Sequence, residues 1–137
     1  MKLISSTVHG ALDYVTGISW MMSPWLFGFS SSDPETGVPV ITGALIILYS
    51  LLTDYEAGLF EIIPMRMHIK LDKAGAMILM ASPWLFGFAS YTWLPHVLMG
   101  LIQLIIASVT HEPQPGVWAR FRRILRRQEQ HYKTTSA

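Results

Sequence analysis

The chain has 137 residues, of which 51% are hydrophobic and only 14% are charged, whereas about 25% of the residues of an average soluble domain are charged. This length suits a single domain. The absence of cysteine excludes disulfides, thiolate metal sites and a cysteine nucleophile.

Three stretches contain no Asp, Glu, Lys or Arg, at residues 14–32, 36–53 and 74–111. A transmembrane helix needs about 20 mostly apolar residues. The first two stretches can therefore supply one span each, and the third can supply two spans joined by a tight turn at about residues 90–93. We predict an all-α membrane protein with four transmembrane helices, at about residues 6–30, 37–57, 65–89 and 93–111. The alternative, a soluble helical bundle, should show a polar stripe on each helix, and residues 38–52 have almost none.

An internal repeat relates the first pair of predicted helices to the second pair. The heptapeptide SPWLFGF occurs twice, at residues 23–29 and 82–88. The same offset of 59 residues pairs His9 with His68 and Asp13 with Asp72. The second helices align at an offset of 57 residues, which pairs Gly43 with Gly100 and Thr53 with Thr110. The repeated unit is therefore a pair of helices.

Each unit contains an even number of helices, so both units enter the membrane from the same side. Such parallel repeats are related by a pseudo-two-fold axis along the membrane normal, and matching residues lie at the same depth. We expect a transmembrane domain at residues 1–111, with the first repeat at about 5–57 and the second at about 64–111. A basic cytoplasmic tail follows at residues 112–137.

The SPW segments begin with Ser23, Pro24 and Trp25 in the first repeat and with Ser82, Pro83 and Trp84 in the second. The proline cannot donate a backbone hydrogen bond and disfavours helical geometry in the preceding serine. Either the helix kinks and continues through Phe29, or it ends, with the serine as N-cap of a new short helix. Both arrangements place the tryptophans near the outer interface and let Gly28 and Gly87 bring helices close together. The segments then form a packed outer plug or an aromatic-lined pocket for a lipid, a quinone or another apolar ligand.

A layer of ionisable residues is predicted at the opposite, cytoplasmic ends of the helices. His9 and Asp13 are four residues apart and therefore share one helix face, and the second repeat copies this spacing. From His9 to Ser23 a helix rises about 21 Å, so the layer lies far from the SPW segments. The second and fourth predicted helices each end with a further ionisable residue of this layer. The expected layer contains His9, Asp13, Asp54, His68, Asp72 and His111.

Ionisable residues at membrane depth are costly and therefore indicate a functional site by default. One interpretation is a divalent transition metal such as zinc, iron or manganese, with the candidate ligands His9, Asp13, His68 and Asp72. A second is haem, with His9 and His68 as trans axial ligands. A third needs no cofactor: the histidines donate to carboxylates and fix the register of the helices. No catalytic residues are predicted, because no Ser/His/Asp spacing or phosphate-binding loop is present.

The tail carries five arginines, Arg120, Arg122, Arg123, Arg126 and Arg127. They follow the fourth helix, so the positive-inside rule places the C-terminus in the cytoplasm, and four spans place the N-terminus there too. Trp118, Phe121 and Leu125 lie between the arginines at helical spacing. This pattern predicts an amphipathic basic helix whose arginines contact anionic lipid headgroups of a bacterial-type inner or plasma membrane. Nucleic acid is not an expected partner of a tail that adjoins a membrane span.

The two SPW segments, each in the first helix of a two-helix unit, resemble the SPW-repeat integral membrane proteins over about residues 5–111. This resemblance implies the membrane fold but implies no biochemical activity. We expect a non-catalytic accessory or scaffold protein whose partners are membrane lipids and either a second copy or a membrane partner protein. The alternative is a protein that binds a metal, another cation or haem, or that takes part in transport, through the His/Asp layer.

Overall fold

The computed structural model describes residues 3–30, 33–110 and 128. It contains four helices, α1 (Ser6–Leu26), α2 (Asp33–Leu51), α3 (Met65–Leu85) and α4 (Leu94–Val109), which confirms the predicted all-helical architecture. The predicted basic helix with its five arginines and the predicted layer residue His111 lie outside the described residues.

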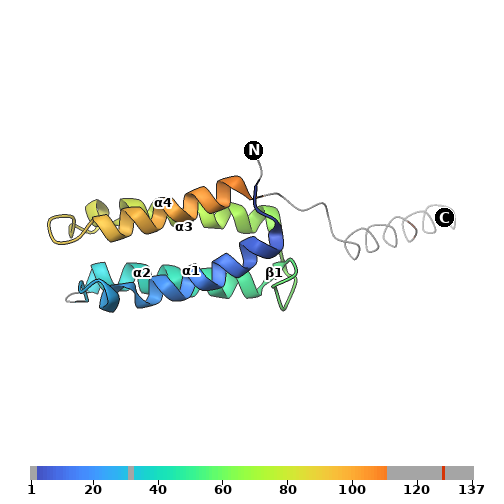
Figure 1. The fold of residues 1–137 in the computed structure, drawn as a ribbon, viewed down its shortest axis with the longest axis horizontal. Helices are drawn as coiled ribbons and strands as arrows, with labels where there is room; N and C mark the ends of the chain where they lie inside the picture. Colours follow the sequence, from blue (N-terminus) through green and yellow to red (C-terminus); the bar gives the residue numbers. More distant parts are fainter. Residues whose placement is uncertain (1–2, 31–32, 111–127, 129–137) are drawn as a thin grey trace, which may run out of the picture.

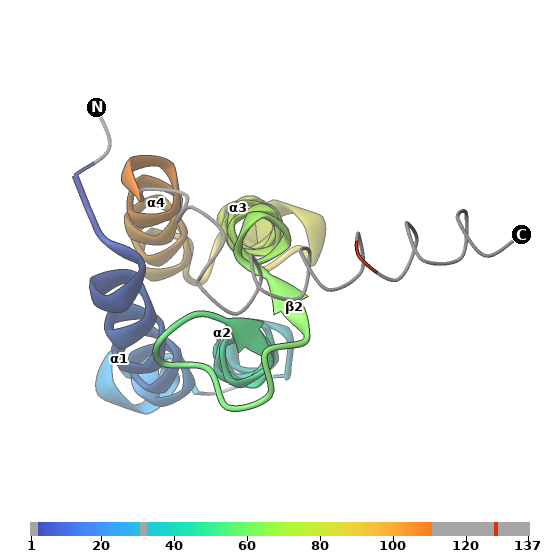
Figure 2. The ribbon, with the colours of Figure 1, turned by 90° about the vertical axis from the view of Figure 1, so that its right-hand side faces the viewer.

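The helices form a bundle of two antiparallel pairs (Figure 1). α1 packs mainly against α2, and α3 packs mainly against α4. Viewed end-on, the four helices stand at the corners of a square in which α1 and α3 are diagonal neighbours (Figure 2). The first helix of each repeat therefore faces its counterpart across the centre of the bundle.

The helices begin close to the predicted residues but end earlier. Ser5 caps α1 by accepting a hydrogen bond from the Val8 backbone nitrogen. α1 ends at Leu26 and α3 at Leu85, four residues before the predicted limits, because Gly28 and Gly87 have φ angles of 70° and 76°. A left-handed glycine at this position terminates a helix. The Phe29 nitrogen donates to the Pro24 carbonyl at 2.9 Å, as in a Schellman motif.

The SPW segments neither end the helix at the serine nor carry it through Phe29, so both predicted arrangements were wrong in part. Pro24 lies inside α1 and leaves the carbonyl of Trp20, four residues earlier, without its usual amide donor. The Ser23 hydroxyl donates to this carbonyl at 2.8 Å. In α3 the Ser82 hydroxyl donates to the Leu79 carbonyl at 2.7 Å in the same way. The serine thus replaces the hydrogen bond that the proline removes.

The two SPW segments are divided between the core and the surface. Phe29 and Phe88 are buried and both contact the His96 ring, with centroid separations of 5.2 and 4.9 Å. Trp25 and Trp84 are 63% and 61% exposed. The phenylalanines therefore close this end of the bundle, whereas the tryptophans point outward.

Glycines allow the close crossing of helices, but not at the predicted positions. A Cβ at Gly28 or Gly87 would meet nothing within 4 Å, so these residues serve the turn only. A Cβ at Gly43 would instead collide with the Gly17 carbonyl oxygen, and one at Gly100 would collide with the Ala76 carbonyl and Met80. These crossings join α2 to α1 and α4 to α3, so they hold each pair together.

The polarity of the helices is inverted relative to that of a soluble bundle. The buried side of α1 contains His9, Asp13 and Ser23, whereas Val15 and Ile18 are exposed. Large exposed apolar surfaces are rare on soluble monomers and mark contacts with lipid or protein. In the described part of the chain, α2 contains one span, Pro34–Leu51, that is long and apolar enough to cross a membrane, and α4 is a shorter apolar helix.

Short backbone pairings tie the repeats together at the end opposite the SPW segments. β1 (Thr53–Asp54) pairs in parallel with β2 (Ile63–Pro64), with Thr53 opposite Ile63. Thr110 forms an isolated parallel bridge with Ile4. Because Thr110 corresponds to Thr53 and Ile4 corresponds to Ile63, each pairing crosses from one repeat to the other.

Candidate metal centre

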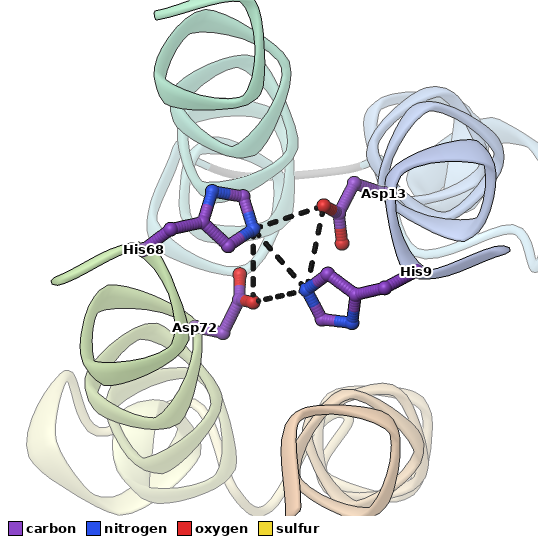
Figure 3. A group of neighbouring side chains, drawn as sticks. All are labelled: His9, Asp13, His68 and Asp72. Carbon is purple, nitrogen blue, oxygen red and sulfur yellow. Dashed lines mark hydrogen bonds and ion pairs between the residues drawn. The ribbon is translucent and has the colours of Figure 1, made fainter. Parts of the chain in front are cut away.

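Two histidines and two aspartates meet on the axis of the bundle near the ends of α1 and α3. We call His9, Asp13, His68 and Asp72 the tetrad (Figure 3). His9 and Asp13 come from consecutive turns of α1, and their counterparts come from α3. All four are 0–1% exposed. The diagonal arrangement of α1 and α3 therefore brings two identical sequence motifs together in a fully buried site.

One atom of each tetrad residue points to the common centre. The separation between the two histidine Nε2 atoms is 3.2 Å. The Oδ2 atom of Asp72 lies 2.9 Å from His9 Nε2 and 3.2 Å from His68 Nε2. The Oδ2 atom of Asp13 lies 2.9 Å from His68 Nε2 and 3.5 Å from His9 Nε2. All four atoms lie within 4.8 Å of one another. The closest histidine–carboxylate pairs thus join different helices.

Two threonines fix the orientation of the imidazole rings. The Thr53 hydroxyl donates to the Tyr49 carbonyl at 2.6 Å, and its oxygen lies 2.8 Å from His68 Nδ1. The Thr110 hydroxyl donates to the Ile106 carbonyl at 2.6 Å, and its oxygen lies 2.8 Å from His9 Nδ1. Because each hydroxyl proton is already used, the oxygen accepts and the ring Nδ1 carries the hydrogen. In the neutral ring Nε2 then presents a lone pair to the centre.

The two aspartates are supported unequally. The Asp72 Oδ1 atom accepts a short hydrogen bond from the Tyr49 hydroxyl and one of 3.0 Å from Gln103 Nε2. Asp13 accepts a hydrogen bond of 3.3 Å from the Ser50 hydroxyl, at Oδ2. The Asp13 Oδ1 atom is buried and has no hydrogen-bond partner among the described residues. The outer oxygen of Asp72 is therefore held by two donors, whereas the outer oxygen of Asp13 is held by none among the described residues.

The polypeptide between the repeats covers the tetrad at Gly10 and His68. The Tyr55 ring lies 5.6 Å from the His68 ring and occupies the space in which a Cβ of Gly10 would stand. Burial raises the pKa of the Tyr55 hydroxyl, which therefore stays neutral. The Tyr14 hydroxyl donates to the Ala57 carbonyl at 2.8 Å, and Ser6 donates to Glu56 at 3.0 Å. These two bonds from α1 hold the covering segment.

The members of the predicted layer of ionisable residues lie at different places in the structure. The structure brings together the four predicted residues of α1 and α3, but not Asp54. α2 ends at Leu51, so Asp54 lies in β1, opposite Pro64 and half-buried, outside the tetrad. α2 and α4 supply uncharged polar groups in place of ionisable residues: Tyr49, Ser50, Thr53, Gln103 and Thr110. Of these five residues, only Thr53 and Thr110 could have been found from the sequence, because the repeat aligns them with each other.

The geometry of the tetrad does not fit the haem interpretation. Trans axial imidazoles have to face each other across a porphyrin ring. The two Nε2 atoms instead lie at hydrogen-bonding distance, the ring planes are inclined by 74°, and carboxylate oxygens stand beside them. A porphyrin has no space between these rings.

Comparison with known proteins identifies the fold family. No curated protein and no solved structure matches the chain. Residues 7–110, which include both helix pairs and the whole tetrad, match the SPW repeat domain. The chain thus belongs to the SPW repeat domain family.

Proposed function

We propose that this protein is a small, non-catalytic integral membrane protein that binds one divalent transition metal ion between its two repeats. The tetrad would supply all four ligands, two imidazole nitrogens and two carboxylate oxygens. The single observation that supports this function is the convergence of four hydrogen-bond acceptors on one fully buried point.

With neutral imidazoles, the four converging acceptors receive one hydrogen bond among the described residues, from Ser50 to Asp13 Oδ2, so they repel one another in a medium of low dielectric constant. The threonines direct both imidazole N–H groups away from the centre, so neutral histidines bring no proton to it. A divalent cation balances the two carboxylate charges and accepts all four lone pairs. Two additional protons, one on each Nε2, would also balance the charge, and the experiment below separates these two occupants.

The separations suit a small tetrahedral ion. Metal–ligand bonds of 2.0–2.1 Å give ligand–ligand distances of about 3.3–3.4 Å in a tetrahedron. Five of the six separations in the tetrad are between 2.9 and 3.5 Å. The sixth, between the two carboxylate oxygens, is at most 4.8 Å, and a cation would shorten it. Zn²⁺ prefers this geometry and accepts nitrogen and oxygen ligands, so we propose an ion of the zinc class.

A site with four protein ligands has no position for a substrate, which is the usual arrangement of a structural rather than a catalytic metal. Each histidine contacts an aspartate and a threonine of the other repeat. An ion at the centre would therefore fasten the two helix pairs together. This role agrees with the expected scaffold function, and a second copy or a membrane partner remains a prediction.

The membrane location is part of the same proposal. α1 and α3 have 21 residues each, which corresponds to about 31 Å and to the thickness of the hydrocarbon core. The exposed side of α1 is largely apolar. That of α3 carries Arg66 and Lys70 in its first two turns and large apolar residues such as Met77 and Ile78 farther along. Trp25 and Trp84 are exposed at one end, as expected at a membrane interface. We therefore propose that all four helices span the membrane, with both chain ends cytoplasmic and with lipid on the outer surface.

The test is the metal content of the full chain, purified in detergent and analysed by mass spectrometry after metal-free dialysis and reloading with Zn²⁺. We expect one ion per chain, and none in the double variant His9→Ala, His68→Ala. The matched control is His96→Ala, because His96 is also fully buried but lies at the opposite end of the bundle. A wild-type protein that binds no Zn²⁺, or a double variant that binds as much as the control, contradicts the proposal and leaves protons as the occupants.

A further inference from the structure

We propose that the two aspartates of the tetrad have different roles: Asp13 is the exchangeable ligand, past which the ion enters and leaves beneath Tyr55, and Asp72 is the fixed ligand. This inference rests on the metal-binding function proposed above and adds the route and the order of ligand exchange.

The difference comes from the residues that surround each carboxylate. Tyr49 and Gln103 both donate to Asp72 Oδ1. At the offset of 57 residues, Tyr49 corresponds to Ile106 and Gln103 corresponds to Ile46. Isoleucine has no hydrogen-bonding group, so the repeat cannot provide Asp13 with the same support. The two repeats have diverged at the positions that hold the carboxylates, although the carboxylates themselves are the same.

The Asp13 Oδ1 atom consequently stays buried without a partner among the described residues. A carboxylate whose outer oxygen is held by two donors keeps its other oxygen turned to the centre, whereas one whose outer oxygen has no donor can rotate and present either oxygen to an arriving ion. Asp13 is therefore the ligand that can release the ion first and accept it last.

The route follows from the position of Tyr55, whose ring packs against His68 and against Gly10, three residues before Asp13. Tyr55 lies over the tetrad from the segment that joins the repeats, and its hydroxyl is also buried without a hydrogen-bond partner of good geometry in the described part of the chain. Its ring fits only because residue 10 is glycine. Two hydrogen bonds, from Ser6 and Tyr14, hold the segment. A displacement of this segment would expose Asp13, whereas Asp72 is surrounded by α2 and α4.

The first experiment compares the affinities of Asp13→Asn and Asp72→Asn for Co²⁺ in detergent, followed by the visible absorption of the bound ion. We expect Asp13→Asn to keep a weakened site and Asp72→Asn to bind at least tenfold more weakly than Asp13→Asn. Equal losses would overturn the inference. If the wild type binds no Co²⁺ or Zn²⁺, the proposed function itself fails, and this result is visible without any variant.

The second experiment leaves all four ligands intact and measures the rate at which excess EDTA removes Co²⁺. Gly10→Ala should displace the Tyr55 ring and raise both the release and the binding rates, about tenfold, with an unchanged Kd. Gly75→Ala is the control, because a Cβ there meets only Thr42 at 3.9 Å. Tyr49→Phe should raise the release rate and also weaken the Kd, because it frees Asp72. Unchanged release and binding rates of Co²⁺ in Gly10→Ala would contradict the route beneath Tyr55. This outcome can be read even if Asp72→Asn does not fold.

Discussion

At the scale of single residues, the tetrad depends on groups that are not ligands. Thr53 and Thr110 have a common arrangement, in which the hydroxyl donates to the carbonyl four residues earlier and accepts from a histidine of the other repeat. The hydroxyl proton is used on the backbone carbonyl, so the hydroxyl oxygen accepts from Nδ1 of the imidazole. In the neutral ring, Nε2 then carries no hydrogen. Residues of this kind usually tune a metal site as strongly as its ligands do.

Thr53→Val and Thr110→Val should each weaken Zn²⁺ binding by about 10–100-fold, because the imidazole loses the acceptor that fixes its tautomer and orientation. A competition titration with a chromogenic chelator measures this change. Thr42→Val is the matched control, because Thr42 donates to the Val38 carbonyl in the same way but contacts no histidine of the tetrad. An affinity of Thr53→Val equal to that of Thr42→Val would contradict the proposed role of the hydroxyl.

At the scale of the helix, the SPWLFGF segment combines three features that end a helix containing a proline. The serine hydroxyl donates to the carbonyl that the proline leaves free, the glycine takes the left-handed conformation, and the last phenylalanine enters the core. Within lipid, no water could bond the freed carbonyl, so the hydroxyl is the available donor. These three features recur in both repeats, whereas the bond to the proline carbonyl comes from Phe29 in the first repeat and from Ala89 in the second.

Ser23→Ala should lower the free energy of unfolding by about 1 kcal/mol, because the Trp20 carbonyl loses its donor. In the background of Pro24→Ala, where residue 24 regains its backbone N–H, the same change should cost almost nothing. The two values form a double-mutant cycle, measured by unfolding in mixed detergent and SDS. Ser19→Ala provides the control, because Ser19 donates to the Val15 carbonyl but precedes no proline. Equal costs in both backgrounds would show that the serine does not compensate for the proline.

At the scale of the whole molecule, side chains of both repeats meet at the tetrad at one end of the bundle and around His96 at the other. The tight crossings at Gly43 and Gly100 lie within each helix pair, whereas most contacts of the tetrad lie between the pairs. The tetrad therefore joins the two repeats, together with the buried apolar cluster of Trp20, Ile46, Leu79 and Met99, which contains one residue of each helix. A metal ion bound at the centre of the tetrad would therefore stabilise the association of the two helix pairs.

Topology can be tested directly because the natural sequence contains no cysteine. Single cysteines at Ser30 and Ser90, in the loops at the SPW end, should react with a membrane-impermeant maleimide added outside intact cells. A cysteine at Glu61, in the segment between the repeats, should react only after the membrane is made permeable. If Ser30→Cys and Ser90→Cys react from opposite sides, the repeats are not parallel and the four-span proposal is wrong.

The sequence alone determined the features that depend on local spacing. The exact repeat predicted two helix pairs, the charge-free stretches predicted four helices, and the four-residue spacing placed His9 and Asp13 on one helix face. Helix ends were predicted less well, because the left-handed conformation of Gly28 and Gly87 becomes evident only with the hydrogen bonds around it. The expected membrane contacts of the tail stay a prediction.

Only the tertiary structure decided which residues meet. The diagonal placement of α1 and α3 joins each histidine to the aspartate of the other repeat, and the early end of α2 removes Asp54 from the site. The support of Asp72 by Tyr49 and Gln103 connects residues of three helices, and no periodicity within one helix contains that information. The physical reason is that a helix fixes the relative positions of its own side chains, whereas contacts between helices depend on how closely and at what angle the backbones pack.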